Sequence, residues 1–99
     1  MPNIIASITF LTDVTEPKTE GVRSGYAPHH KFVGISWLAS GFHQYPDVDL
    51  HFPGEMLEAE IRFVSWEELR DVVKPGAEFE VRELERIIGI GMVKTVISD

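Results

Sequence analysis

The stretch FEVRELERIIGIGMV, Phe79 to Val93, decides the fold of this chain. Its first part alternates apolar with charged residues, so Phe79 and Val81 are predicted to share the buried face of a strand. After a tight turn, Arg86 begins a run rich in β-branched residues, which favours a last strand that continues to Ile97. The two segments therefore predict a β-hairpin near the C-terminus.

The glycines of this hairpin, Gly89 and Gly91, are interpreted as a requirement of the backbone. They lie on one face of the last strand, where the missing side chains permit a sharp bend or a close approach of backbone. A phosphate-binding loop would open a helix and carry a third glycine or a Gly-Lys-Ser/Thr ending, and neither follows. The chain contains no G-x-x-x-x-G-K-[ST] sequence, so we expect no GTP binding.

Short alternating segments make up much of the remaining sequence. We predict strands over residues 5–11, 31–38, 47–52, 56–64 and 77–83, in addition to the last strand. Three apolar residues of the segment 47–52 are predicted to face the core: Val48, Leu50 and Phe52. Six short strands separated by Gly and Pro turns indicate an all-β fold, either an antiparallel sandwich or a closed barrel.

One segment departs from the β pattern and predicts a short helix near residues 66–73. Ser65 and Glu68 have the spacing of a capping box, and apolar residues then recur at helical intervals. The helix is predicted to end before Pro75. Trp66, just after the cap, belongs either to the core or to a binding surface.

The composition describes a small acidic domain. A length of 99 residues fits one domain over residues 1–99, and 43% hydrophobic residues is ordinary for a globular fold. The absence of cysteine excludes disulfides and thiolate zinc sites and favours a reducing compartment. No signal peptide or membrane span is recognisable, so we expect a cytoplasmic protein that does not bind membranes. The formal net charge of −7 opposes binding to nucleic acid.

Three motifs, in this order, resemble the C-terminal β-barrel domain of the elongation factor Tu family. They are GYAP at residues 25–28, DLHFPGE at residues 49–55, and the hairpin sequence, whose order of Arg-Glu, turn, arginine and Gly-x-Gly is the most specific. The resemblance extends from about Ile4 to Ile97. It implies a stand-alone antiparallel barrel of about six strands, with the helix near 66–73 as a local addition.

The resemblance also implies an RNA partner. In the family, this domain helps to hold aminoacyl-tRNA by its T stem and contacts the other domains of the factor. By that analogy Arg23, Lys31 and Arg86 contact RNA, and the alternative is that they pair with surface glutamates. The chain has Ala27 where the family has a basic residue. Binding to tRNA or other RNA is therefore the alternative function.

A segment rich in aromatic residues points to a protein partner, which is the leading hypothesis. Phe42, His43 and Tyr45 lie next to Pro46 in a predicted turn, and exposed aromatic side chains in loops commonly anchor protein interfaces. The alternative is that Phe42 and Tyr45 fold back and plug one end of a barrel. We predict a non-enzymatic binding module that engages a protein, linked to translation through the resemblance.

A metal or small-molecule site at Asp49 and His51 is a weaker alternative. The two residues alternate on the polar face of the predicted strand 47–52, and a carboxylate and an imidazole are both metal ligands. A solvated polar face is the competing interpretation. No Gly-x-Ser-x-Gly elbow or other catalytic set is recognisable, so we predict no enzyme activity and no cofactor.

Overall fold

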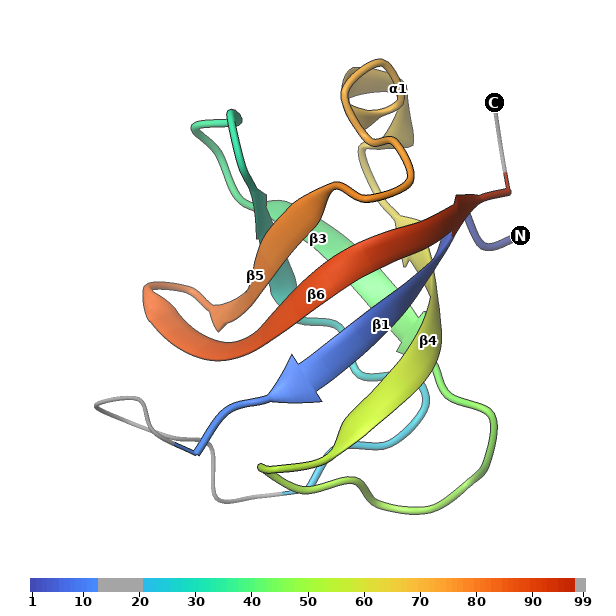
Figure 1. The fold of residues 1–99 in the computed structure, drawn as a ribbon, viewed down its shortest axis with the longest axis vertical. Helices are drawn as coiled ribbons and strands as arrows, with labels where there is room; N and C mark the ends of the chain where they lie inside the picture. Colours follow the sequence, from blue (N-terminus) through green and yellow to red (C-terminus); the bar gives the residue numbers. More distant parts are fainter. Residues whose placement is uncertain (13–20, 98–99) are drawn as a thin grey trace.

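The computed structural model describes residues 1–12 and 21–97, which form six strands and one short helix (Figure 1). The elements are β1 (Ile4–Phe10), β2 (His29–Phe32), β3 (Ala39–Gln44), β4 (Met56–Phe63), α1 (Trp66–Leu69), β5 (Glu78–Glu83) and β6 (Arg86–Val96).

The strands pair antiparallel and close into a barrel in the order β1-β4-β3-β2-β5-β6. This confirms the prediction of an all-β fold and selects the barrel over the sandwich. The predicted hairpin forms between β5 and β6, where Glu83 pairs with Arg86 across a two-residue turn. No helix in the described parts of the chain is long and apolar enough to cross a membrane.

Alternating residues along the strands fill the inside of the barrel. β1 alternates buried and half-buried residues along its whole length, and Phe79 and Val81 of β5 are buried as predicted. Gly91 faces the Phe79 ring, and a Cβ built at Gly91 would lie 2.2 Å from Cζ of that ring. The ring thus occupies the volume that a side chain at Gly91 would need. The predicted close approach of backbone occurs at Gly89, where a Cβ would lie 3.0 Å from the Thr9 carbonyl oxygen.

The segment 47–52 is a loop, so the prediction of a strand there is wrong. Three apolar side chains predicted to be buried are exposed: Val48, Leu50 and Phe52. The Asp47 carboxylate accepts a hydrogen bond from the Asp49 N–H, a turn that competes with strand pairing. The segment also contacts other backbone through a β-bridge between His51 and Val22.

A different segment supplies the strand that the sequence pattern missed. The inward positions of β3 are Ala39, Gly41 and His43, so no large aliphatic residue marks the strand in the sequence. The predicted strand 31–38 is also wrong in its extent, because β2 ends at Phe32 and the chain turns near Gly34, which has φ +88°.

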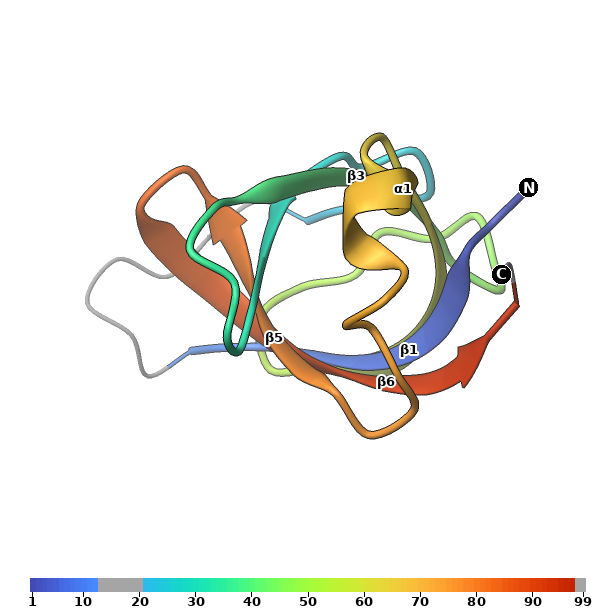
Figure 2. The same cartoon turned by 90° about the horizontal axis from the view of Figure 1, so that it is seen from above.

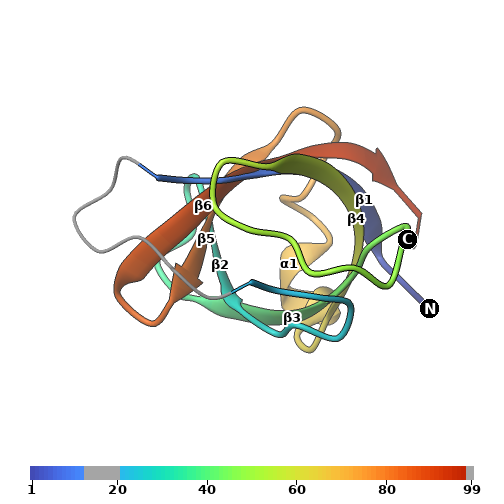
Figure 3. The ribbon, with the colours of Figure 1, turned by 90° about the horizontal axis from the view of Figure 1, so that it is seen from below.

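One turn of helix covers one end of the barrel (Figure 2). The helix is shorter than predicted, and the side chain of Ser65 makes no capping bond; its carbonyl instead accepts a hydrogen bond from Glu68 N–H at 3.1 Å. Trp66 is buried and stacks on Phe63 with the ring centroids 6.1 Å apart, so it belongs to the core. At the opposite end, the loop between β3 and β4 crosses the opening (Figure 3).

Candidate functional site

A chain of hydrogen bonds runs through the buried interior of the barrel. Nδ1 of His30 lies 2.9 Å from the Ala39 carbonyl oxygen, and Nε2 of His30 lies 2.8 Å from Nε2 of His43. On the other side of His43, Nδ1 lies 2.9 Å from the Tyr45 hydroxyl. Both imidazoles are 0–1% exposed, and Gly41 makes room for that of His30, because a Cβ at Gly41 would lie 3.0 Å from Cε1 of His30.

The hydrogen-bond partners decide which ring nitrogens of His30 and His43 carry a proton. Since a carbonyl only accepts, His30 must donate through Nδ1, and its neutral Nε2 accepts from His43. His43 is then left with an acceptor at Nδ1, to which the Tyr45 hydroxyl donates. Burial lowers the pKa of His30 to about 4 and lowers that of His43 well below its usual range. Both rings are therefore neutral at pH 7.

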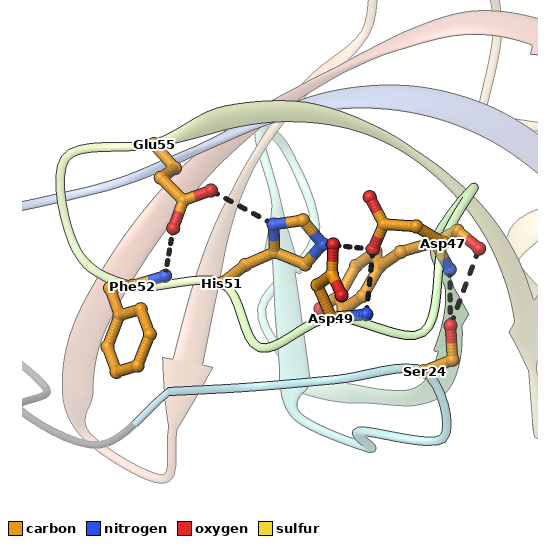
Figure 4. A network of polar contacts seen from close by, with 7 residues as sticks. Ser24, Asp47, Asp49, His51, Phe52 and Glu55 are labelled. Atoms are coloured by element: carbon orange, nitrogen blue, oxygen red, sulfur yellow. Dashed lines mark hydrogen bonds and ion pairs between the residues drawn. The ribbon is translucent and has the colours of Figure 1, made fainter.

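A second polar network, which we call the His51 cluster, surrounds His51 in the loop after β3 (Figure 4). Nε2 of His51 lies 2.8 Å from a carboxylate oxygen of Asp47, and Nδ1 lies 3.0 Å from one of Glu55. The other oxygen of Glu55 accepts a hydrogen bond from the Phe52 N–H. The bond to Glu55, and then that to Asp47, raise the pKa of His51, while the bonds at the carboxylates lower the pKa of both acids.

The His51 cluster is a closed network of ion pairs. Both ring nitrogens face carboxylates, so the ring donates to both of them when it is protonated. Asp49 enters the network through its backbone N–H. Within residues 1–12 and 21–97, no group of three or more histidine, aspartate or glutamate side chains is placed to hold a metal ion.

The predicted aromatic anchors separate in the structure. His43 and Tyr45 are buried in the barrel, at 1% and 3% exposed, so these two residues form no exposed anchor here. The plug interpretation, made for Phe42 and Tyr45, agrees with the burial of Tyr45 but not with the exposure of Phe42. The predicted turn at this segment is also wrong, because Phe42 lies on β3. Phe42 is 38% exposed on the outer side, where the Arg62 guanidinium lies 4.5 Å from its ring centroid.

Two of the three cations predicted to contact RNA, Lys31 and Arg86, lie next to glutamates. Lys31 of β2 stands directly opposite Glu80 of β5, and Arg86 forms an ion pair with Glu83 at the β5–β6 turn. Arg23 is exposed in the loop before β2. Carboxylates beside the cations weaken the local attraction for phosphate.

An apolar surface that the sequence analysis did not identify lies on the outer side of β6, β1 and β4. Strand register places Thr9 between Ile90 and Met56, and it places Ser7 beside Met92. We call these five residues the outer stripe. Its large side chains are well exposed: Met56 by 71%, Ile90 by 49% and Met92 by 46%. The sequence signal was available for part of it, because Ile90 and Met92 alternate with the two inward glycines of β6.

Glutamates border the outer stripe on both sides. Glu58 and Glu60 lie on β4, and Glu78 and Glu80 lie on β5 opposite Met92 and Ile90. Glu58 pairs with Lys94 and Glu80 pairs with Arg82. We call these four glutamates the acidic rim.

Two surface hollows adjoin the rim. One, of about 310 Å³, is lined by Gln44, Tyr45, Pro46, Glu58, Ala59 and Glu60. The other, of about 410 Å³, lies between β2, β5 and β6 and is lined by Lys31, Phe32, Val33, Glu78, Phe79, Glu80, Arg82 and Ile90. Each hollow has two rim glutamates in its wall, but only the second contains a residue of the stripe, Ile90, and its wall also contains Lys31 and Arg82.

No family model matches this chain, and no curated protein matches it. The features that bear on function are thus the buried histidine chain, the His51 cluster and the outer stripe with its rim.

Proposed function

We propose that this protein is a non-enzymatic binding module that engages a protein partner through the outer stripe. The observation that carries the proposal is the co-facial exposure of Ile90, Met92 and Met56 on adjacent strands. Apolar side chains gathered on one face, rather than scattered, are typical of interaction surfaces. Methionine is well suited to such a surface, because its flexible side chain adapts to the shape of a partner.

The remaining groups support binding rather than catalysis. The neutral imidazoles of His30 and His43 are enclosed in the barrel, away from any substrate in solution. His51 is near the surface, but both of its nitrogens are engaged by carboxylates. The resemblance to the elongation factor Tu barrel, in a chain without cysteine, supports a cytoplasmic role linked to translation.

Affinity capture with surface variants tests this proposal. The double variant Ile90→Ser/Met92→Ser removes the largest side chains of β6 from the stripe, and we expect it to lose a protein that the wild type retains from extract. The matched control is Val48→Ser/Val72→Ser, which removes exposed apolar side chains elsewhere and is expected to retain the protein. Amide NMR spectra first establish that both variants are folded.

The outcomes separate the stripe from the other candidate surfaces. Equal retention by both double variants contradicts the proposal. Loss with Phe42→Ala alone would move the site to the outer side of β3, where Phe42 contacts Arg62. Recovery of RNA in place of protein would instead support the RNA-binding alternative, with an affinity that falls steeply as salt rises.

A further inference from the structure

We infer that the hollow between β2, β5 and β6 binds a free α-amino acid with an apolar side chain. The three strands lie side by side in the barrel (Figure 3). The wall of the hollow is formed by residues of these strands and by Val33, whose N–H donates to the Glu78 carbonyl at 3.3 Å. The inference goes beyond the proposed function, because it concerns a small molecule and not the protein partner.

The charged side chains of this wall leave one cation and one anion without an ionic partner. Arg82 donates to the Glu80 carboxylate through Nε at 2.9 Å and through a second guanidinium nitrogen, so these two charges offset each other. Lys31 and Glu78 form no ion pair with any residue that the structure describes. Nζ of Lys31 donates to the Phe32 carbonyl oxygen at 3.2 Å, which leaves two of its three N–H groups for a ligand.

A ligand that carries both signs of charge is complementary to this wall. A purely anionic ligand would approach Glu78 and Glu80, a purely cationic one would approach Lys31 and Arg82, and like charges oppose both approaches. An α-amino acid brings a carboxylate for Lys31 and an ammonium group for Glu78. Both contacts are hydrogen bonds between charged groups, which are stronger than those between neutral groups.

The spacing of the two unpaired charges suits an α-amino acid. Strand register places Lys31 opposite Glu80, so Glu78, two residues away on the same face of β5, is a diagonal neighbour of Lys31. Diagonal neighbours on paired strands are about 7–8 Å apart. The ammonium and carboxylate groups of an α-amino acid are bonded to one carbon, so with a hydrogen bond of about 2.8 Å at each end the molecule spans about 8 Å. One molecule can therefore contact both side chains.

Exposed apolar side chains in the same wall favour a ligand with an aliphatic side chain. Val33 is 81% exposed and Ile90 is 49% exposed, and both line the hollow. A ligand side chain that covers them removes apolar surface from water. The volume of about 410 Å³ lies near the lower end of the range of about 300–1,000 Å³ found for ligand sites, so it suits a single amino acid such as leucine.

Titration with L-leucine followed by amide NMR tests the inference. We expect leucine to shift the amide signals of Val33, Glu78, Glu80 and Ile90, with a dissociation constant on the order of 1 mM. Three analogues each lack one of the groups that the hollow recognises: leucinamide lacks the carboxylate, N-acetyl-leucine lacks the ammonium group, and glycine lacks the side chain. Each analogue should bind about fivefold more weakly than leucine.

Two variants assign the charged groups of the ligand to their partners. Lys31→Met should weaken the binding of leucine by about fivefold and should bind leucine and leucinamide about equally, because the contact that it removes is the one that leucinamide lacks. By the same reasoning, Glu78→Gln should bind leucine and N-acetyl-leucine about equally. The matched controls Lys74→Met and Glu68→Gln change exposed residues outside the hollow and should leave the affinity for leucine within about twofold. Amide spectra first establish that all four variants are folded.

Several results would overturn the inference. They are the absence of a saturable shift with leucine, equal binding of leucine and glycine, shifts confined to residues outside the hollow, or a preference for leucine over both charged analogues that persists in Lys31→Met and Glu78→Gln. The capture experiment decides the proposed function separately, because Lys31 and Glu78 lie outside the outer stripe and the titration requires no protein partner.

Discussion

The buried His30–His43 pair and the surface residue His51 show how the pKa of the same side chain is shifted in opposite directions in one small barrel. The pair is enclosed by the core, where each ring finds a neutral partner and burial disfavours the cation. His51 lies between two carboxylates that favour the cation. Surroundings, rather than residue type, decide in which direction the pKa of each histidine moves.

The two regions also affect stability in opposite directions as the pH changes. The unfolded chain binds more protons than the buried pair below pH 6.5, so the contribution of the pair is complete above that pH and declines as the pH falls. The folded pKa of His51 is raised, so its contribution is complete below pH 6.5 and is lost as the pH rises through the folded pKa.

The largest expected effect comes from acidifying the buried pair. Between pH 6.5 and pH 4, we expect the free energy of unfolding to fall by about 3 kcal/mol because of His30, with a further decrease from His43. Urea unfolding at a series of pH values measures this loss. Histidine ¹⁵N spectra provide the site-specific control, since both rings of the pair must remain neutral at pH 6. A pair that titrates near pH 6.5 would contradict the proton assignment.

A smaller loss of stability is expected when the Tyr45 hydroxyl, the last group in the buried series of hydrogen bonds, is removed. Tyr45→Phe leaves Nδ1 of His43 buried without its donor, which should lower the free energy of unfolding by about 1–3 kcal/mol at pH 7.5. Urea unfolding measures the loss, and the ¹⁵N signals of His43 report the change at the ring. Tyr26→Phe is the control for those signals, because the Tyr26 hydroxyl bonds Glu83 instead. Unchanged His43 signals in Tyr45→Phe would count against the hydrogen bond between the Tyr45 hydroxyl and His43.

The same comparison explains how much of the fold the sequence predicted. Where the inward residues are large and apolar, as Phe79 and Val81 are on β5, alternation identified the strand. Where the inward positions hold small residues and His43, as on β3, the strand was missed, because histidine does not mark a buried face in a sequence. The loop 47–52 shows the reverse error, since its alternation is real but its apolar side chains have no strand to bury them.

The candidate site was predictable only in part for a related reason. The alternation of β6 assigns Ile90 and Met92 to the face opposite the glycines, so their exposure followed from the hairpin sequence. Met56 joins them only through strand register, because β1 stands between β4 and β6 and is distant from both in the sequence. The buried pair depends in the same way on β2 and β3 lying side by side.

The smallest expected effect tests the surface member of the comparison. His51→Gln removes a cation between Asp47 and Glu55, and it should lower the free energy of unfolding by less than about 1 kcal/mol at pH 6, because exposed carboxylates are screened by solvent. The wild-type ring loses its extra proton as the pH rises through its raised pKa, so the difference between variant and wild type should be smaller at pH 9 than at pH 6. Urea unfolding at both pH values measures the two differences. Asp49→Asn is the matched control, since Asp49 joins the cluster through its backbone. A larger loss at pH 9 than at pH 6 would show that the ring stabilises the loop as a neutral group, and the contrast with His30 and His43 would then fail.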